Sequence, residues 1–414
     1  MERVVACIDV GTTKICTLIG EADAAGNVRV IGAGVAPSRG IRKGVVVNVQ
    51  EATEAITASV EKAERIVGFS IDKACVGLAG AHISSLNSRG AVAVNRGERG
   101  VQPADVERAL EAARAIAIPH NRQVIHAIPR SYILDGDDGV RDPLGMQAYR
   151  LEVEAHIITG ASASIQNLIR CVQNTGVDIE AIVVESLAAG EAILTDMERE
   201  MGVVLADIGG GTTDVAIFIE GSVWHTVVLP IGGEHITHDI AIGLRTPFTT
   251  AEELKIRYGC ANPGQVPADE TFEVTAFGEG GSQRVARRFL AQIIQARVEE
   301  IFEFIQKEIK RSGYDGLLPA GVVLCGGTAE LAGIRDLARE VLGLPTRLGA
   351  PHSLRGLVDM LSGPAYATSV GLLQWGVQPE GPRPPAPRRN ERFKLPGWLR
   401  AFLPERATPA GTPY

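Results

Sequence analysis

Two glycine-rich stretches combine an aspartate with threonines in an order that suits phosphate binding. "DVGTTK" covers residues 9–14, and "DIGGGTTD" covers residues 207–214. Glycine lets the backbone approach an anion closely, while hydroxyls and successive N–H groups form a concave nest for its oxygens. An aspartate beside such a nest repels phosphate unless a cation lies between them. Asp9 and Asp207 therefore predict Mg²⁺ held through water.

The phosphate contacts themselves are predicted in the two turns, where Lys14 adds a positive charge. A plain hairpin turn is an equal alternative for the first stretch taken alone. It is disfavoured for the second, because three successive glycines cost backbone entropy that a simple turn need not lose. The predicted phosphate-binding residues are Gly11, Thr12, Thr13, Lys14, Gly209, Gly210, Gly211, Thr212 and Thr213.

The elements around these turns repeat. Residues 4–8 and 203–206 are apolar strands that end at the aspartates, and each turn leads into a return strand. This pattern indicates an internal duplication at a separation of about 200 residues. Between the copies, residues 84–160 alternate strand-like and helical patterns, which predicts an inserted α/β subdomain.

A third glycine turn follows the apolar strand at residues 322–325. A helix with apolar residues at Leu331, Ile334, Leu337 and Val341 is predicted after it, so that N–H groups and the helix dipole face a ligand. Such turns are common in α/β folds, so this turn alone is weak evidence for a ligand-binding site. The GxxxxGK[ST] and GxGxxG patterns do not occur in the sequence, which removes P-loop and Rossmann interpretations.

The composition of the chain limits the classes of partner and the cellular compartment that can be expected. The chain of 414 residues has a net charge of −8, which argues against nucleic acid as the main partner. Its six cysteines are scattered, without zinc-binding spacing, and are predicted to be reduced thiols. Residues 1–30 lack the apolar run of a signal peptide, and no apolar stretch approaches the roughly 20 residues that cross a bilayer. A cytoplasmic protein body is expected.

The C-terminal tail differs from the body in charge and pattern. Seven basic and three acidic residues follow Gly376, a net charge of +4, which leaves −12 for the rest. Residues 377–391 are proline-rich and predict an extended linker. If residues 396–403 are helical, their apolar side chains form one stripe flanked by basic residues, which favours a bilayer surface. Docking of a disordered tail on the body or on a partner protein is the alternative. The predicted membrane contacts are Phe393, Lys394, Trp398, Leu399, Arg400, Phe402 and Leu403.

The three glycine turns, with "VVESLAAG" (183–190) and "PAYATSVG" (364–371) as two connecting helices, resemble the actin, Hsp70 and sugar-kinase superfamily. "PSRGIRKG" (37–44) and "LAGAHISSLNSRG" (78–90) extend the resemblance to the FtsA family of bacterial cell-division proteins. The implied fold class is α/β and actin-like, with two duplicated ribonuclease-H-like halves around a nucleotide cleft. The inserted α/β subdomain belongs to the first half.

The resemblance also implies domain bounds. They are 1–83 with 161–195 for the first core subdomain, 84–160 for the inserted subdomain, 196–231 with 314–376 for the second core subdomain, 232–313 for a helical and β subdomain, 377–391 for the linker, and 392–405 for an amphipathic membrane-targeting helix.

The resemblance further implies ATP and Mg²⁺ as ligands. Glu252 and Lys255 in "AEELKIRYG" would contact ribose and adenine, and the adenosine motif "VVLCGGTAEL" places Gly326, Gly327 and Thr328 at the nucleotide. Glu185 would orient an attacking water, since water positioning is what phosphoryl transfer requires. Weak or absent ATPase activity is expected.

The implied partners are those of cell division. Asp239, Arg297 and Glu300 match the family's surface for the C-terminal peptide of FtsZ, although a solvated helix face with i,i+3 pairing is an alternative for the last two. Self-assembly into actin-like filaments, contacts with later division proteins, and a peripheral place on the cytoplasmic face of the membrane at the division site are also implied. A type IV pilus-type actin-like ATPase and a small-molecule kinase of the same superfamily are the alternative functions.

Overall fold

The computed structural model describes residues 3–24, 26–94, 100–275, 282–352, 354–357 and 359–377. The predicted membrane-targeting helix, with its seven membrane contacts, and the predicted linker beyond Val377 lie outside the described residues.

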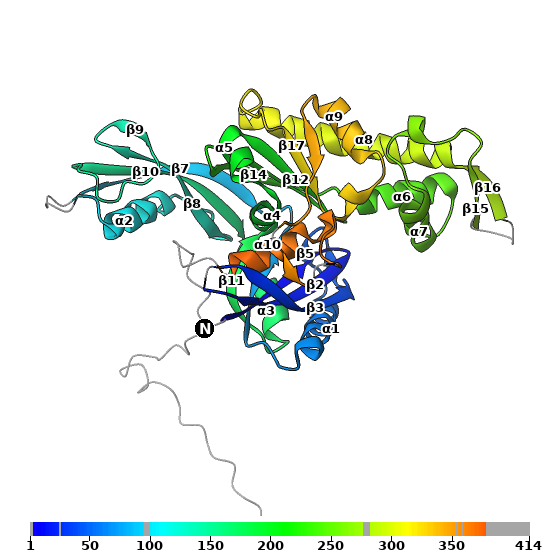
Figure 1. The fold of residues 1–414 in the computed structure, drawn as a ribbon, viewed down its shortest axis with the longest axis horizontal. Helices are drawn as coiled ribbons and strands as arrows, with labels where there is room; N and C mark the ends of the chain where they lie inside the picture. Colours follow the sequence, from blue (N-terminus) through cyan, green and yellow to red (C-terminus); the bar gives the residue numbers. More distant parts are fainter. Residues whose placement is uncertain are drawn as a thin grey trace, which may run out of the picture.

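Two sheets that share an arrangement of five strands form the core, and the first has β19 as a sixth strand (Figure 1). The first has the order β11-β6-β1-β2-β3-β19, and the second has the order β14-β13-β12-β17-β18. Strands of the first are β1 (Arg3–Val10), β2 (Lys14–Ala22), β3 (Val28–Pro37), β6 (Lys73–Leu78), β11 (Asp178–Val184) and β19 (Arg355–Gly356). Strands of the second are β12 (Val203–Ile208), β13 (Thr213–Ile219), β14 (Ser222–Leu229), β17 (Val322–Cys325) and β18 (Thr346–Leu348).

The pairing directions also match between the two sheets. β1 runs antiparallel to β2 and parallel to β6, just as β12 runs antiparallel to β13 and parallel to β17. All six residues of β12 are buried, as expected for a central strand that is covered on both faces. The predicted duplication into two actin-like halves is therefore confirmed.

Two helices join the halves. α4 (Glu185–Ile193) and α10 (Ala367–Trp375) pack against each other between the sheets (Figure 1). A Cβ on Gly371 would lie 1.7 Å from the carbonyl oxygen of Ala188. Only glycine allows so close an approach, and α10 is thereby brought against the ends of β1 and β12.

The remaining helices of the first half cover its sheet. α1 (Val49–Val67) begins at Asn48, whose side chain accepts from the N–H groups of Gln50 and Glu51, and ends at Gly68 with φ 79°. Its buried face lies on β2 and β3, and α3 (Ser162–Gln173) lies beside it. A short hairpin of β4 (Ile41–Arg42) and β5 (Val45–Val46) precedes α1.

An inserted sheet extends from the core at one end of the molecule (Figure 1). Its order is β7-β10-β8-β9, and α2 (Pro103–Arg114) covers β7 and β10. The strands are β7 (Ser84–Ala93), β8 (Arg122–Leu134), β9 (Asp137–Val140) and β10 (Arg150–Ala161). The inserted α/β subdomain of the predicted fold class is thus present, while the exact domain bounds stay a prediction.

A helical region extends from the opposite end (Figure 1). It contains α6 (Gly233–Leu244), α7 (Phe248–Tyr258), η1 (Pro263–Gln265), the hairpin of β15 (Thr271–Thr275) with β16 (Ser282–Ala286), and α8 (Arg287–Ser312). Most of the apolar residues of α8 are buried, but Phe289 is 47% exposed. The second half also contains α5 (Asp196–Met201), α9 (Ile334–Leu342), and the 3₁₀ turns η2 (Gly327–Glu330) and η3 (Pro364–Tyr366).

The segment after the third glycine turn differs from the prediction. A single helix starting at the turn and carrying Leu331 was expected, but η2 occupies the turn and α9 begins only at Ile334. Gly333 separates them with φ 78°, a left-handed conformation that a continuous helix does not contain.

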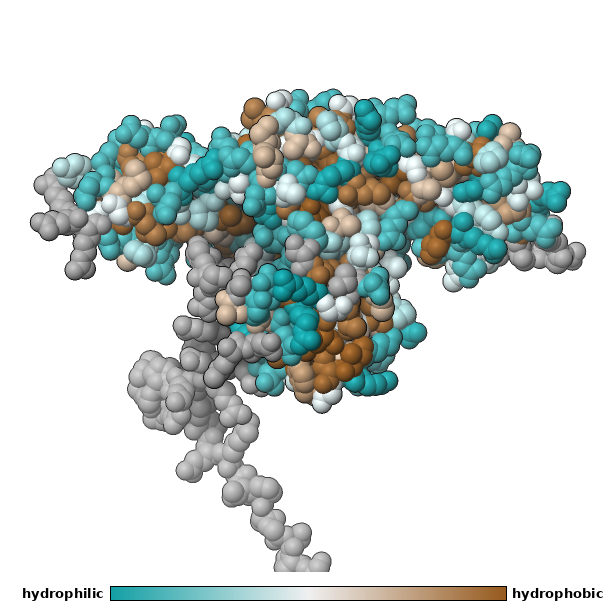
Figure 2. Space-filling model, viewed as in Figure 1, coloured by the Kyte–Doolittle hydropathy of each residue, from teal (hydrophilic) through white to brown (hydrophobic). Residues whose placement is uncertain are grey.

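Hydrophilic residues cover most of the face in Figure 2, and apolar residues gather over its lower part, where Figure 1 places α1 and β3. Across the described residues, no helix is both long and apolar enough to cross a bilayer.

Candidate nucleotide-binding site

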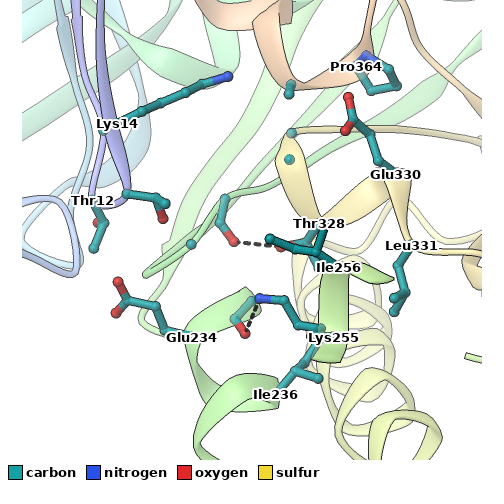
Figure 3. Close-up of a pocket in the computed structure, with 18 of the residues that line it drawn as sticks. Thr12, Lys14, Glu234, Ile236, Lys255, Ile256, Thr328, Glu330, Leu331 and Pro364 are labelled. Carbon is teal, nitrogen blue, oxygen red and sulfur yellow. Dashed lines mark hydrogen bonds between the residues drawn. The ribbon is translucent and has the colours of Figure 1, made fainter. Parts of the chain in front are cut away.

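A cavity of about 770 Å³ lies between the two halves, and Figure 3 shows part of its lining. This volume is within the usual range for a small-molecule site. Both halves contribute side chains, as the predicted nucleotide cleft requires. Lining residues among those predicted to bind nucleotide or cation are Asp9, Gly11, Thr12, Thr13, Lys14, Glu185, Asp207, Gly209, Gly210, Thr212, Glu252, Lys255, Gly326, Gly327 and Thr328.

The two predicted phosphate turns abut each other. A Cβ on Gly210 would lie 2.0 Å from Thr13 Oγ1, and a Cβ on Gly211 would lie 2.7 Å from Thr12 Oγ1. The successive glycines are therefore required by the close contact between the halves as well as by any anion. Within the second turn, Gly209 N–H donates to the carbonyl of Thr212 at 2.9 Å.

Gly211 and Thr213 do not line the cavity. Gly211 packs behind the first turn, against Thr12. Thr213 is fully buried, and its hydroxyl donates to the carbonyl oxygen of Ile231 at 2.8 Å.

Asp9 and Asp207 occupy equivalent places at the ends of β1 and β12. Ser369 Oγ donates to Asp9 Oδ2 at 2.6 Å, and Thr368 Oγ1 donates to Asp207 Oδ2 at 2.6 Å. Two neighbouring residues of α10 thus fix one carboxylate from each half. Neither hydroxyl residue is distinguished by the local sequence pattern, although both lie in the stretch "PAYATSVG".

Burial perturbs the carboxyl groups around this point. It raises the pKa of Asp207 from 3.8 to about 6, and it also raises the pKa of Asp9. The pKa values of Glu185 and Asp214 are raised well above normal by burial, and further by the charges of the neighbouring aspartates.

Two of these carboxyl oxygens lack a hydrogen-bond partner, namely Glu185 Oε1 and Asp214 Oδ1. In the described residues, no three acidic, histidine or cysteine side chains come together closely enough to hold a metal ion directly. Buried carboxylates that are short of positive charge, in a polar cleft with room for water, fit a hydrated Mg²⁺ better than a directly ligated metal.

Lys14 approaches the cavity from β2. Its ammonium nitrogen lies 3.5 Å from the centre of the Tyr366 ring, a cation–π contact with η3. The lysine that could meet a phosphate is therefore held by a side chain from the second half of the chain.

The opposite end of the cavity is formed by α6, α7 and η2. Lys255 Nζ donates to Glu252 Oε2 at 2.7 Å, to Thr237 Oγ1 at 2.9 Å and to the carbonyl oxygen of Gly233 at 3.2 Å. Thr328 Oγ1 donates to the carbonyl oxygen of Gly209 at 2.9 Å, which ties the third glycine turn to the second.

The same end of the cavity is partly apolar. Its apolar lining includes Ile236, Phe248, Ile256 and Leu331, of which Ile256 is 76% exposed (Figure 3). Large apolar side chains at a cavity mouth suit a planar base. Ile256 follows Lys255 in sequence, but periodicity gives no sign that it faces a ligand.

A separate cluster joins α6 to α8. Arg297 Nε donates to Asp239 Oδ2 at 2.5 Å, Arg297 Nη2 donates to Asp239 Oδ1 at 3.0 Å, and Arg297 also pairs with Glu300. The hydrogen bonds that Arg297 donates to Asp239 raise the pKa of the Arg297 guanidinium. The structure therefore brings together the three residues predicted to contact an FtsZ peptide, in a partly exposed ion-pair network.

Comparison with known proteins identifies similar chains. A family model described as "Cell division protein FtsA" matches residues 204–371, and one described as "SHS2 domain inserted in FTSA" matches residues 80–159. Cell division protein FtsA of Pseudomonas aeruginosa is 46% identical over 376 residues, covering 91% of this chain and 90% of the relative. The FtsA proteins of Bacillus subtilis and Escherichia coli K12 are 40% and 34% identical, covering 90% and 91% of this chain and 83% and 91% of the relatives.

Solved structures agree on the fold. A chain of a PilM-PilN type IV pilus biogenesis complex matches with a TM-score of 0.65 at 16% identity, covering 91% of this chain and 99% of that one. MreB5 of Spiroplasma citri bound to ADP matches with a TM-score of 0.54 at 13% identity, covering 90% and 95%. At these identities the likeness supports the actin-like fold alone.

Proposed function

Because the chain belongs to the FtsA family of cell division proteins, we propose that it tethers FtsZ filaments to the cytoplasmic face of the membrane at the division site. In this proposal the chain binds ATP with Mg²⁺, polymerises into actin-like filaments in an ATP-dependent way, and helps to recruit later division proteins. Family membership favours this function over a type IV pilus ATPase, for which the likeness is 16% identity, and over a small-molecule kinase.

The main support for nucleotide binding is the cleft between the duplicated halves. Two glycine turns meet there, beside buried carboxyl groups of which two have an oxygen without a hydrogen-bond partner. Asp9 and Asp207 would hold Mg²⁺ through water, and the ion would supply the positive charge that lets phosphates lie beside these carboxylates. Glu252 and Lys255 would contact the nucleoside. The ADP-bound MreB5 relative supports this use of the fold.

The environment of Glu185 supports weak turnover. Its side chain lines the cavity, and burial raises the pKa of its carboxyl group well above the usual value. Burial disfavours the ionised form of this carboxyl group, and the ionised form is the one that could accept a proton from an attacking water. We therefore propose ATP binding with slow or no hydrolysis.

Calorimetric titration tests the nucleotide proposal. Mg-ATP should bind with one site per chain, and EDTA should weaken binding, because phosphates then face Asp9 and Asp207 without a cation. Binding that is unchanged by EDTA, or no binding at all, would overturn the proposed site.

The ion-pair network on α6 and α8 offers one guanidinium and two carboxylates to a partner, and the partner proposed here is the C-terminal peptide of FtsZ. Arg297→Glu would place a like charge opposite Asp239 and Glu300, and FtsZ-peptide affinity should fall at least about tenfold, since broken charge pairs at interfaces cost 2 kcal/mol or more.

Lys307→Glu is the matched control for this experiment. It reverses a charge on the same helix, ten residues or roughly 15 Å further along, where Lys307 is 67% exposed. Unchanged affinity in Arg297→Glu, or an equal loss in both variants, would refute the assigned surface when measured by fluorescence anisotropy.

Membrane attachment is proposed for residues 392–405, on their sequence pattern alone. Trp398, Leu399, Phe402 and Leu403 give one apolar stripe, and the basic residues around them suit anionic headgroups.

A further inference from the structure

The turn between β4 and β5 lies at the mouth of the cleft. The pairing of Arg42 with Val45 leaves Lys43 and Gly44 as its two central residues, with φ of 50° and 72°. Positive φ at both positions is the type I′ pattern, whose first position favours asparagine, aspartate or glycine. Lysine is an uncommon choice there, because its Cβ makes the left-handed conformation costly.

Two other hairpin turns of the chain share this backbone. Asp135–Gly136 and Glu220–Gly221 also have positive φ at both positions. They differ in surroundings: a Cβ on Gly136 would meet nothing within 4 Å, and one on Gly221 would meet only the end of the Glu200 side chain at 3.6 Å. The conformation alone therefore indicates no function. Whether the Lys43–Gly44 turn has a role at the cleft depends on its contacts.

The Lys43–Gly44 turn is held against the first phosphate turn. Gly44 N–H donates to Thr12 Oγ1 at 3.1 Å, and Gly44 itself lines the cavity. A Cβ on Gly44 would lie 2.7 Å from the backbone nitrogen of Gly80, so the turn is enclosed on that side.

The turn also reaches the second half of the protein. Lys43 Cα lies 3.0 Å from the position that a Cβ on Gly211 would occupy. At the neighbouring glycine, Glu234 N–H donates to the carbonyl oxygen of Gly210 at 2.8 Å. Lys43, from the first half, and Glu234, at the start of α6, therefore flank one glycine pair.

Lys43 and Glu234 carry opposite charges and come from different halves of the protein. Figure 3 shows the Glu234 carboxylate turned toward the loop that carries Thr12. Burial and the charge of Glu252 raise the pKa of the Glu234 carboxyl group, and the positive charges of Lys255, Arg42 and Lys43 lower it. Lys43 also contributes, after burial, to the lowered pKa of His235.

We propose that Lys43 is a positioning residue that attracts Glu234 across the mouth of the cleft and thereby slows nucleotide release. In this proposal, nucleotide release requires the two halves to move apart, which separates the β4–β5 turn from α6. The proposal rests on the proposed binding of ATP in this cleft. The attraction between Lys43 and Glu234, here called the clasp, would add to the contacts between the phosphate turns.

Stopped-flow displacement of a fluorescent ATP analogue, with Mg²⁺ present, tests the clasp. Lys43→Asn suits the type I′ turn and removes the charge, so the release rate should rise about fivefold, the factor expected from a partly exposed charge pair of about 1 kcal/mol. Lys43→Arg should keep the rate within about twofold, because it retains the charge. Glu220→Asn, the same kind of substitution in the remote turn, should leave the rate unchanged.

A double-mutant cycle distinguishes the clasp from a direct contact between Lys43 and a phosphate. If Lys43 acts through Glu234, then Glu234→Gln should speed release similarly, and the double variant should be no faster than either single variant. Independent, multiplying effects, or a Lys43→Asn rate equal to wild type, would overturn the proposal. Failure of the wild-type chain to bind the analogue would instead refute the proposed function, and the clasp with it.

Discussion

Replacement of Asp207 by asparagine is expected to stabilise the nucleotide-free protein. Asp207 is buried at the end of β12, and its pKa is raised by that burial despite the hydrogen bond from Thr368. Asparagine has nearly the same shape and keeps an oxygen that can accept from the threonine. The substitution therefore removes the charge while preserving the packing.

The expected magnitude follows from the pKa. A rise from 3.8 to about 6 corresponds to about 3 kcal/mol at 1.36 kcal/mol per pKa unit. Because the folded-state pKa is the higher one, the folded state binds more protons between these values, and the cost is fully present above about pH 6. It shrinks as the pH falls through this range and is lost below 3.8, where both states are protonated.

Urea unfolding in EDTA at pH 7.5 measures the effect. Asp207→Asn should raise the free energy of unfolding by up to about 3 kcal/mol, with an advantage that shrinks as the pH falls below 6. Asp315→Asn, which neutralises an exposed side chain, should change it by less than about 0.5 kcal/mol. Mg-ATP should then stabilise the wild type more than Asp207→Asn.

A less stable Asp207→Asn protein in EDTA would refute this reasoning. It would mean that the carboxylate is favourably solvated or paired in the nucleotide-free cleft, and that the cluster does not need a cation.

Two further substitutions test other parts of the site. Gly210→Ala should lower Mg-ATP affinity at least about tenfold by calorimetry, because its Cβ would meet Thr13 Oγ1 at 2.0 Å, whereas Gly316→Ala, with nothing within 4 Å, should not. Equal affinities would show that the turns need not touch. Thr368→Val should reduce the free energy of unfolding by about 1–3 kcal/mol in urea, because it leaves the Asp207 carboxyl without its hydroxyl donor, and Thr368→Ser should restore most of the loss. A Val variant as stable as wild type would contradict the assigned hydrogen bond.

Local patterns were sufficient for the parts of the site that lie within one hairpin. The positions of Asp9 and Asp207 at the ends of two matching strands could be predicted, because a buried strand, an aspartate and a glycine turn follow one another directly in the sequence and this pattern occurs twice. The two matching sheets confirm that duplication.

Contacts between distant elements were not predictable in this way. Ser369 and Thr368 meet carboxylates that are 360 and 161 residues away, and as small buried residues on an apolar helix they resemble ordinary core positions. The importance of the Lys43–Gly44 turn likewise becomes visible only through its contact with Gly211, which belongs to the other half of the protein. The start of α9 was misplaced because the apolar spacing continues through Gly333, whose left-handed backbone ends the helical pattern.

Vesicle flotation with FtsZ present tests the tethering claim most directly. With Mg-ATP and anionic vesicles, FtsZ should float with the full chain, but not with a chain that ends at Gln378 or with Arg297→Glu. Neutral vesicles should carry less of the full chain, since the basic tail residues gain from anionic headgroups. Flotation of FtsZ with the shortened chain, or its absence with the full chain on anionic vesicles, would contradict the account.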